Sequence, residues 1–252
     1  MARLLTVLLK LIPGVLVLLL WQLFVWLNPQ NEFFIGSPRG VVKELIPLFL
    51  DGSLLRDVWA TMLEAILGFV LGSAFGTAAG LFLWFSVRLR TVVRPYIGVL
   101  GAIPIFALGP IVIFWFGTEM MSKVVLGFLS TFAIAVSQAY AGAVEADPNL
   151  HKLMKAYGAS RSQIFMKLIV PSSTIWVLAG LRLNIGMALL GAFVGEFIAS
   201  KQGLGHLIIV AEGLYNINQV WVGVFGIVSL ATLFLAATTP VEGWARRWKT
   251  ES

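Results

Sequence analysis

The chain has 252 residues, of which 59% are hydrophobic and only 12% are charged, about half the charged fraction of a soluble globular domain. This composition excludes most soluble proteins and indicates a protein embedded in a membrane. The absence of cysteine excludes disulfides, thiolate metal sites and a cysteine nucleophile, and only two histidines, His151 and His206, are present. The net charge of +6 is typical of a membrane protein with basic cytoplasmic loops.

Uncharged runs mark the candidate spans, because a helix needs about 20 apolar residues to cross a hydrocarbon layer of roughly 30 Å. Five such runs occur, and a sixth is interrupted only by Arg182. The sequence therefore predicts an all-α membrane protein with six transmembrane helices in a single domain, residues 1–252. In chain order the predicted spans are residues 11–31, 65–87, 95–118, 124–144, 168–195 and 213–241.

The first run resembles a secretion signal, because Arg3 and Lys10 precede an apolar segment. It is longer than the apolar region of a signal peptide, and no small-residue cleavage site follows Leu27. We therefore expect an uncleaved helix.

Basic residues predict the orientation of the six spans, because positively charged loops stay in the cytoplasm. Cytoplasmic termini place most basic residues inside and put residues 28–60 and 200–217 outside. The inner set is Arg3, Lys10, Arg88, Arg90, Arg94, Lys152, Lys155, Arg161, Lys167, Arg246, Arg247 and Lys249, and the outer set is Arg39, Lys43, Arg56, Lys123 and Lys201. We expect both termini in the cytoplasm.

Two outer segments have apolar residues at helical spacing. Residues 38–50 predict a short interfacial helix, and residues 204–214 predict a similar helix on or slightly within the outer surface. Neither segment indicates a chemical activity.

The second predicted span has a glycine at every fourth position of one helix face: Gly68, Gly72, Gly76 and Gly80. Small residues at this spacing allow two helix backbones to approach closely, which favours association in lipid. The row predicts tight packing, within one subunit or across a dimer. A contact that slides during a transport cycle is the alternative.

Pro104 and Pro110 interrupt the third predicted span, and a proline inside a helix removes a backbone hydrogen bond that lipid cannot replace. Broken helices are tolerated where protein or a water-filled cavity surrounds them. Residues 101–109, which include Phe106, are therefore a candidate lining of a translocation pathway. A packing kink is the alternative.

Arg182 is the most informative charge in the predicted spans. It lies 11 residues after Pro171, the expected start of its span, so a rise of about 1.5 Å per residue places it roughly 16 Å deep. An arginine at that depth suggests a polar interior, a partner or an anion. Glu196 is a poor partner on the same helix, because 14 residues separate the two by about 21 Å. A structural role and a role in conducting a polar solute both stay open.

The candidate pathway residues are Pro104, Phe106, Arg182 and Met187.

The sequence contains no motif that indicates an enzymatic activity. Both histidines fall in loops and not in the spans, and the sequence contains neither H-E-x-x-H nor a G-x-x-x-x-G-K-[ST] phosphate loop. We expect no catalytic residue, no metal site and no cofactor on this chain. If the protein is an energised transporter, another subunit hydrolyses ATP.

The largest inner loop, residues 145–167, predicts a helix–glycine–helix unit. Asp147 supplies an N-cap, Pro148 the first helical position, Gly158 a left-handed helix end and Ser160 the cap of a second helix. The side chains available for apolar contacts are Leu153, Met154, Tyr157 and Ile164. The unit predicts a compact knob on the cytoplasmic face, and a basic loop packed on lipid headgroups is the alternative.

This loop resembles the EAA coupling loop of permease subunits in bacterial binding-protein-dependent ABC importers, whose pattern is E-A-A, three residues, G, nine residues, I-x-L-P. Gly158 and Pro171 have the required separation of 13 residues, whereas Lys152, Leu153 and Met154 occupy the E-A-A places without an acidic residue. The resemblance implies ATPase coupling through Lys152, Leu153, Met154, Tyr157, Gly158, Ala159, Ser160 and Pro171.

Further segments, in the same order on the chain, resemble the nitrate, sulfonate, taurine and bicarbonate importer permeases. They are IPIFALGPIVIFWFG, DPNLHKLMKAYGASRSQIFMKLIVP, GLRLNIGMALLGAFVGEFIAS and KQGLGHLI. The resemblance implies the type I ABC importer fold in a bacterial inner membrane and a permease homodimer. It also implies two ATP-binding cassette subunits that bind ATP and Mg, and an extracytoplasmic solute-binding protein.

The resemblance leaves the solute open. It favours a sulfonate, taurine, nitrate or similar oxyanion, and permeases for pyrimidines, riboflavin-like molecules and aromatic acids resemble this chain too. A secondary transporter or channel is a rival class, although such proteins usually keep intramembrane acids, and Glu64 and Glu196 lie near span ends. A non-transporting scaffold subunit is a second rival, which would not need the helix–glycine–helix unit.

Overall fold

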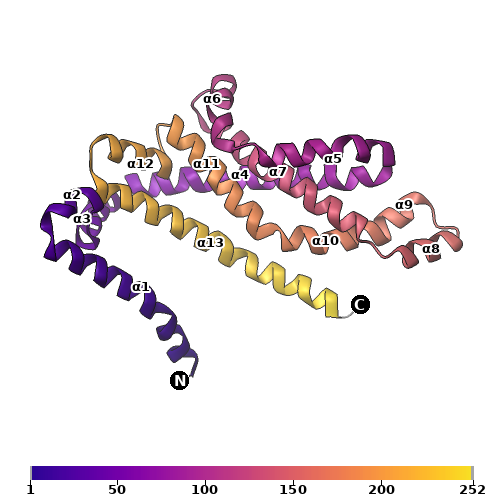
Figure 1. Ribbon diagram of the computed structural model, residues 1–252, viewed down its shortest axis with the longest axis horizontal. Coiled ribbons are helices and arrows are strands. Elements are labelled where there is room, and N and C mark those ends of the chain that lie inside the picture. The colour runs from indigo at the N-terminus through magenta and orange to yellow at the C-terminus, as the bar shows by residue number, and fades with distance from the viewer. Residues whose placement is uncertain (1, 251–252) are drawn as a thin grey trace.

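The computed structural model describes the backbone of residues 2–250 and the side chains of residues 12–99 and 101–238, and every regular element in this part is helical. The α-helices are α1 Ala2–Leu27, α2 Glu32–Ile35, α3 Pro38–Leu50, α4 Ser53–Phe82, α5 Val87–Ala102, α6 Ile105–Phe116, α7 Met120–Val144, α8 Pro148–Ala156, α9 Arg161–Ile164, α10 Val170–Ala179, α11 Leu181–Ile198, α12 Leu204–Gly213 and α13 Ile217–Thr250. The short elements η1 Pro29–Asn31, η2 Leu83–Phe85 and η3 Phe165–Ile169 connect some of them. The molecule is elongated, with α8 and α9 at one end and α2, α3 and α12 at the other (Figure 1).

The centre of the fold is the pair α4 and α7, joined along the predicted glycine row. Gly68, Gly72, Gly76 and Gly80 are all buried. A Cβ on Gly68 would lie 2.8 Å from the Cα of Gly127, and one on Gly76 would lie 2.6 Å from the carbonyl oxygen of Phe132. The row therefore packs against a helix of the same chain, at backbone contact.

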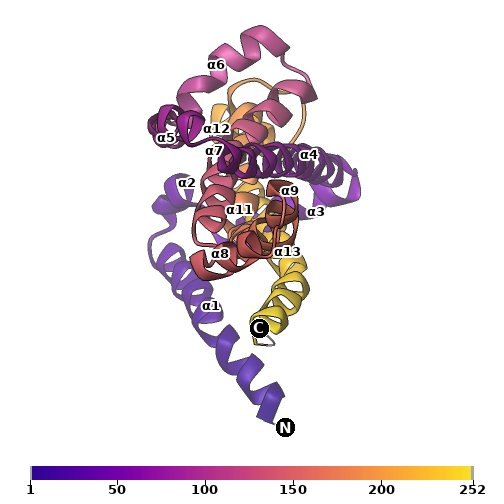
Figure 2. The same ribbon diagram turned by 90° about the vertical axis from the view of Figure 1, so that its right-hand side faces the viewer.

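Helices α10, α11 and α13 complete the bundle around this pair, and Figure 2 shows α1 and the end of α13 extending away from it. At one end, Leu204 and Leu207 of α12 pack with Val222 and Leu230 of α13. At the other end, Ala143 packs with the segment that leads into α10, and the buried residues there are Ile164, Leu168 and Ile169. Each end of the bundle thus has its own apolar core.

Five helical segments of the described residues are long and apolar enough to cross a membrane: Ser53–Phe85, Met120–Val144, Arg161–Ala179, Leu181–Ile198 and Ile217–Thr238. A sixth is counted if Ile12–Leu27 and Pro29–Ile35, bent by 113° relative to each other, form one span. The predicted all-α membrane fold is confirmed.

Three of the differences between the uncharged runs and the helices have a clear physical reason. The run 65–87 covers only part of α4, because Asp57 and Glu64 are buried against protein and do not end the helix. The run 95–118 is divided between α5 and α6, because Pro104 has no N–H and the backbone of Ile103 before it is extended. The run 168–195 covers the end of η3, then α10 and most of α11, which follow each other across Gly180.

Both outer segments form helices, α3 over Pro38–Leu50 and α12 over Leu204–Gly213, and their place at a membrane surface stays a prediction. Helix α3 begins at Pro38, and the Ser37 hydroxyl caps it by accepting a hydrogen bond from the Gly40 N–H at 2.9 Å. Trp21 of α1 joins this region, since its indole N–H donates to the Gly36 carbonyl at 3.1 Å.

Five basic residues that contribute to the predicted orientation lie outside the residues whose side chains are described. They are Arg3, Lys10, Arg246, Arg247 and Lys249.

Candidate functional site

The helix–glycine–helix unit stands at the tip of the molecule, as α8 and α9 (Figure 1). The Asp147 carboxylate caps α8 by accepting a hydrogen bond from the Asn149 N–H at 2.7 Å, and Pro148 occupies the first helical position. Gly158 has a φ of 79°, in the left-handed region that other residues rarely adopt. The sequence predicted each of these features.

Backbone hydrogen bonds around Gly158 form a Schellman motif, which ends α8 sharply. The Gly158 N–H donates to the Lys155 carbonyl at 3.1 Å, and the Ala159 N–H donates to the Met154 carbonyl at 3.0 Å. Ser160 then forms a capping box with Gln163 at the start of α9. The angle between the two helices is therefore held by the backbone of residues 154–160 and needs no partner protein.

The unit exposes fewer apolar side chains than the sequence predicted. Leu153 and Tyr157 point outward, with 52% and 85% of their surface exposed. Ile164 is buried, and Met154, which is half-buried, packs on the same core. Spacing along the sequence could not separate the two faces, because the second face exists only where Met154 meets the core formed by the end of α7, α9 and η3.

Pro171 has a structural consequence one turn earlier in the chain. Proline has no N–H to close the normal helical turn, and residues Phe165–Ile169 form a wider turn in which the Val170 N–H donates to the Phe165 carbonyl. The wide turn lies between the unit and α10.

An aromatic cluster that the sequence analysis missed attaches this unit to the bundle. Phe165 packs on Trp84 and Phe85 at ring-centroid distances of 5.7 and 4.5 Å. The Arg161 guanidinium lies 5.9 Å from the centre of the Trp84 ring, and its Nη2 donates to the Phe85 carbonyl at 3.0 Å. Trp84 and Phe85 are adjacent aromatic residues at the end of a predicted span and precede a basic segment. This pattern is the one that could have indicated the cluster from the sequence.

Three of the four candidate pathway residues line one cavity of about 510 Å³. Pro104 and Phe106 reach it from the break between α5 and α6, and Met187 reaches it from α11. Phe132 and Phe193 add aromatic rings to the same wall. Among the described side chains that line it, Ser130 is the one with a polar group.

Arg182, the fourth candidate, does not line this cavity. It lies in the first turn of α11 with its side chain exposed on the surface of this chain. Arg182 therefore lies apart from the cavity that Pro104, Phe106 and Met187 line.

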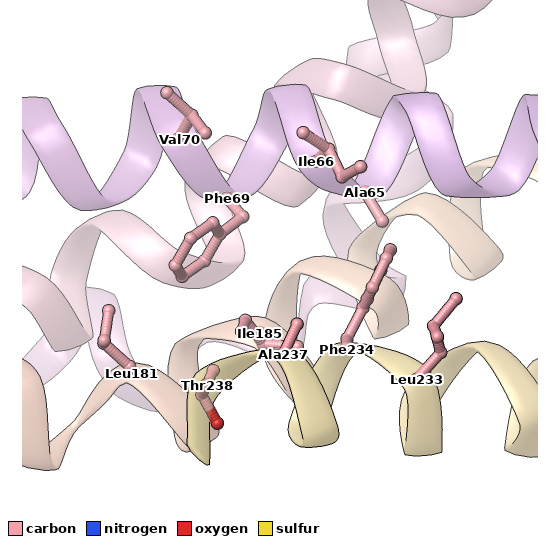
Figure 3. A pocket seen from close by; sticks show the side chains of 10 residues that line it. All are labelled: Ala65, Ile66, Phe69, Val70, Leu181, Ile185, Leu233, Phe234, Ala237 and Thr238. Atoms are coloured by element: carbon pink, nitrogen blue, oxygen red, sulfur yellow. The ribbon is translucent and has the colours of Figure 1, made fainter. Parts of the chain in front are cut away.

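A further groove of about 500 Å³ lies between α4, α11 and α13. Figure 3 shows Phe69 and Ile66 of α4 facing Phe234 and Leu233 of α13 across it, with the Thr238 hydroxyl as the one polar group drawn. The Thr238 hydroxyl already donates to the Leu235 carbonyl at 2.8 Å, and the other lining side chains are apolar, so the groove suits hydrocarbon better than a polar solute.

Buried polar side chains gather at the opposite end of the bundle, near α12. They are Asp57, Thr61, Glu64, Lys123 and Glu196. The Lys123 ammonium donates to the carbonyl oxygens of Thr118 and Glu119, at the start of its own helix. Within the described part of the chain, no three His, Asp or Glu side chains are grouped so that they could hold a metal ion.

Three of these side chains hold the first turn of α12. Asp57 accepts a hydrogen bond from the Gly203 N–H at 2.9 Å, Thr61 accepts one from the Leu204 N–H at 2.9 Å, and Glu196 accepts one from the Gly205 N–H at 2.7 Å. The N–H groups at a helix N-terminus have no partner in their own helix, so buried acceptors satisfy them here. The cluster therefore fastens α12 to α4 and α11.

An exposed ion pair closes the same end of the molecule. Lys201 donates to the Glu119 carboxylate at 3.0 Å and holds the pKa of that carboxyl below its ordinary value. The pair links the loop before α7 to the loop before α12.

Replacing Asp57 by alanine is expected to loosen α12. The variant leaves the buried Gly203 N–H without an acceptor, at a cost of about 1 to 3 kcal/mol in the free energy of unfolding. We expect faster tryptic cleavage after Lys201, in the exposed loop before α12, and a lower melting temperature in detergent. Asp57→Asn is the matched control, since its amide oxygen can still accept this hydrogen bond. Equal cleavage rates in both variants and the unmodified chain would contradict the anchoring role.

Comparison with known proteins identifies the family of this chain. A family model described as a binding-protein-dependent transport system inner membrane component matches residues 68–247. A Haemophilus influenzae protein named "Probable ABC transporter permease protein" is 32% identical over 222 residues, which cover 88% of this chain and 89% of that protein.

Two relatives have more specific names. The taurine transport system permease protein TauC of Escherichia coli is 27% identical and covers 87% of this chain and 82% of its own length. The riboflavin transport system permease protein RibX of Chloroflexus aurantiacus is 30% identical and covers 90% of this chain and 84% of its own length.

Solved structures share the fold. A chain of the MetNI methionine ABC transporter, in an inward-facing conformation, superposes with a TM-score of 0.69 at 16% identity, covering 78% of this chain and 97% of that one. A chain of a bacterial ABC transporter involved in alginate import has a TM-score of 0.65 at 16% identity, covering 98% and 96%. The predicted type I importer permease fold is confirmed. The chain therefore belongs to the family of inner membrane components of binding-protein-dependent transport systems.

Proposed function

We propose that this chain is one of two identical permease subunits of an ATP-driven importer in a bacterial inner membrane. Two ATP-binding cassette subunits bind ATP and Mg, and an extracytoplasmic protein delivers the solute. Both termini and the α8–α9 unit face the cytoplasm. The chain itself has no catalytic residue and no cofactor.

The observation that carries the proposal is the outward face of α8. Leu153 and Tyr157 are exposed there, and the Schellman motif at Gly158 holds this short helix at the tip of the molecule. An apolar side chain and an aromatic one on a rigid projection suit a groove on another protein. The loss of the acidic E-A-A residue at Lys152 removes one ionic contact and leaves this shape unchanged.

Force on the unit can reach the bundle through two connections. Arg161 and Phe165 join α9 and η3 to Trp84 and Phe85 of η2, which directly follows α4. The wide turn before Pro171 joins the same unit to α10. Movement of two ATPase subunits toward each other would therefore act on both helices and open the permease pair outward, provided that the two states bind their partners differently.

The solute we propose first is a sulfonate such as taurine, in line with the sequence resemblance and with the name of TauC. A second solute class, a flat aromatic heterocycle, is favoured by one observation. The cavity at Pro104 has the rings of Phe106, Phe132 and Phe193 in its lining and no charged side chain among its described residues. Stacking on such rings suits a heterocycle better than a small oxyanion.

Co-purification tests the assembly. The chain, tagged and expressed with its neighbouring genes, should purify with an ATPase at a ratio of two to two, and a solute-binding protein should stimulate ATP hydrolysis. The ligand of that binding protein then identifies the solute, and uptake of labelled taurine against a labelled heterocycle separates the two classes. A chain that purifies alone and moves solute into liposomes without ATP would support a secondary transporter instead.

A further inference from the structure

A cavity of about 650 Å³ lies behind the α8–α9 unit and is distinct from the outward face of α8. Its walls come from η2 and the start of α5, the end of α7, and the inner sides of α8 and α9. No proposed transport step places a ligand in it, although Trp84 and Arg161 of its lining also belong to the connection between the unit and the bundle.

The rim of this cavity is basic. Arg90, Lys155 and Arg161 line it together with His151, and no acidic side chain belongs to its lining in the described part of the chain. Two acids flank lining residues along the chain: Asp147 caps α8, and Glu145 lies between Val144 and Ala146 with an exposed side chain that does not belong to the lining. The cavity thus gathers positive charge without internal compensation.

The floor of the cavity is apolar. The buried side chains of Ala143, Ile164 and Ile169 line it, and Trp84 also belongs to the lining. A cationic rim over a hydrocarbon floor matches an amphiphile, whose charged head lies at the rim and whose chain begins below it. A small hydrophilic anion would leave the floor unused.

The fold holds parts of the rim in place before any ligand arrives. The guanidinium of Arg161 is fixed by its bond to the Phe85 carbonyl and by the Trp84 ring, and Arg90 is half-buried. Val87, the first residue of α5, also lines the cavity, so the positive end of that helix dipole contributes, whereas the N-terminus of α8 is already capped by the Asp147 carboxylate.

The depth of the cavity agrees with a lipid. Trp84 lies at the end of the candidate span Ser53–Phe85, where tryptophan marks the boundary between hydrocarbon and headgroups. Basic pockets between helices at this level suit anionic headgroups.

We propose that this cavity binds the phosphate of an anionic phospholipid, with Arg90 and Lys155 as its principal cationic contacts. Bound lipid would stabilise the position of α8 and α9 relative to η2, next to the aromatic cluster at Trp84.

Native mass spectrometry of the whole chain in detergent tests this proposal, with phosphatidylglycerol and phosphatidylcholine of identical acyl chains as probes. The unmodified chain should prefer phosphatidylglycerol. The double variant Arg90→Gln/Lys155→Gln should bind phosphatidylglycerol about tenfold more weakly or worse, because it removes two of the cationic contacts. The matched control Arg88→Gln/Arg94→Gln removes the same charge from exposed positions of α5 outside the cavity and should keep the preference.

Three results would overturn the proposal. Equal weakening in the two double variants would mean attraction to the whole basic surface. Displacement of bound phosphatidylglycerol by millimolar inorganic phosphate would identify a soluble phosphate compound as the occupant. Loss of ATPase co-purification in the Arg90→Gln/Lys155→Gln variant, with unchanged lipid binding, would make the cavity a protein contact. A normal melting temperature of each variant shows that the chain has folded.

Discussion

Replacing Gly76 by leucine is expected to prevent α4 and α7 from packing. Even the Cβ of the new side chain would lie 2.6 Å from the Phe132 carbonyl oxygen and 2.7 Å from the Cβ of Ala135. Both neighbours belong to a buried helix and neither is the flexible end of a side chain, so the helices must separate. We expect a loss of about 3 kcal/mol or more in the free energy of unfolding, seen as a large fall in melting temperature in detergent.

Gly98→Leu is the matched control for this experiment. Gly98 lies inside a helix, α5, and a Cβ there meets no atom within 4 Å. Leucine is the better helix former by about 0.5 to 1 kcal/mol, so this variant should be as stable as the unmodified chain or slightly more so. Equal melting temperatures for Gly76→Leu and Gly98→Leu would show that the glycine row does not determine the packing.

Replacing Gly158 by tryptophan is expected to abolish transport while the membrane bundle stays folded. A Cβ at Gly158 meets no atom of this chain within 4 Å, so the indole projects outward from the tip beside Leu153 and Tyr157. The left-handed backbone at Gly158 costs a residue with a Cβ about 1 to 2 kcal/mol, which acts on the α8–α9 turn. Uptake should fall to background and the ATPase subunit should no longer co-purify, whereas the melting temperature should change by only a few degrees.

Gly158→Asn separates the two causes of that loss. Asparagine tolerates the left-handed conformation better than other residues with a Cβ and adds little bulk, so it should retain most of the uptake. If Gly158→Trp shows normal uptake, the α8 tip does not dock on an ATPase. If Gly158→Asn fails as completely as tryptophan, backbone strain and not the added bulk explains the defect.

These two glycines serve the proposed transport cycle in opposite ways. Gly76 lies where the backbones of α4 and α7 approach closely, which leaves no room for a larger side chain. Gly158 has open space around it and shapes a projection toward another molecule. The same residue type therefore supports close contact in one place and a tight turn in the other.

Local sequence patterns determined much of the fold. The glycine row of α4, the cap at Asp147, the turn at Gly158 and the cap at Ser160 depend on residues a few positions apart, so their chemistry is visible in the sequence. The apolar runs likewise predicted an all-α membrane protein, although burial of Asp57 and Glu64 made α4 longer than its uncharged part.

Tertiary structure alone decided which distant residues meet. Glu196 and Asp57 lie far apart in the chain yet hold the same turn of α12, and Arg161 finds its acceptor at Phe85, 76 residues earlier. The inward direction of Met154 and the separation of Arg182 from the Pro104 cavity also follow from how the helices pack. Hydrogen bonding and helix periodicity act over a few residues, whereas these contacts depend on the rotation and crossing of whole helices, which no local pattern specifies.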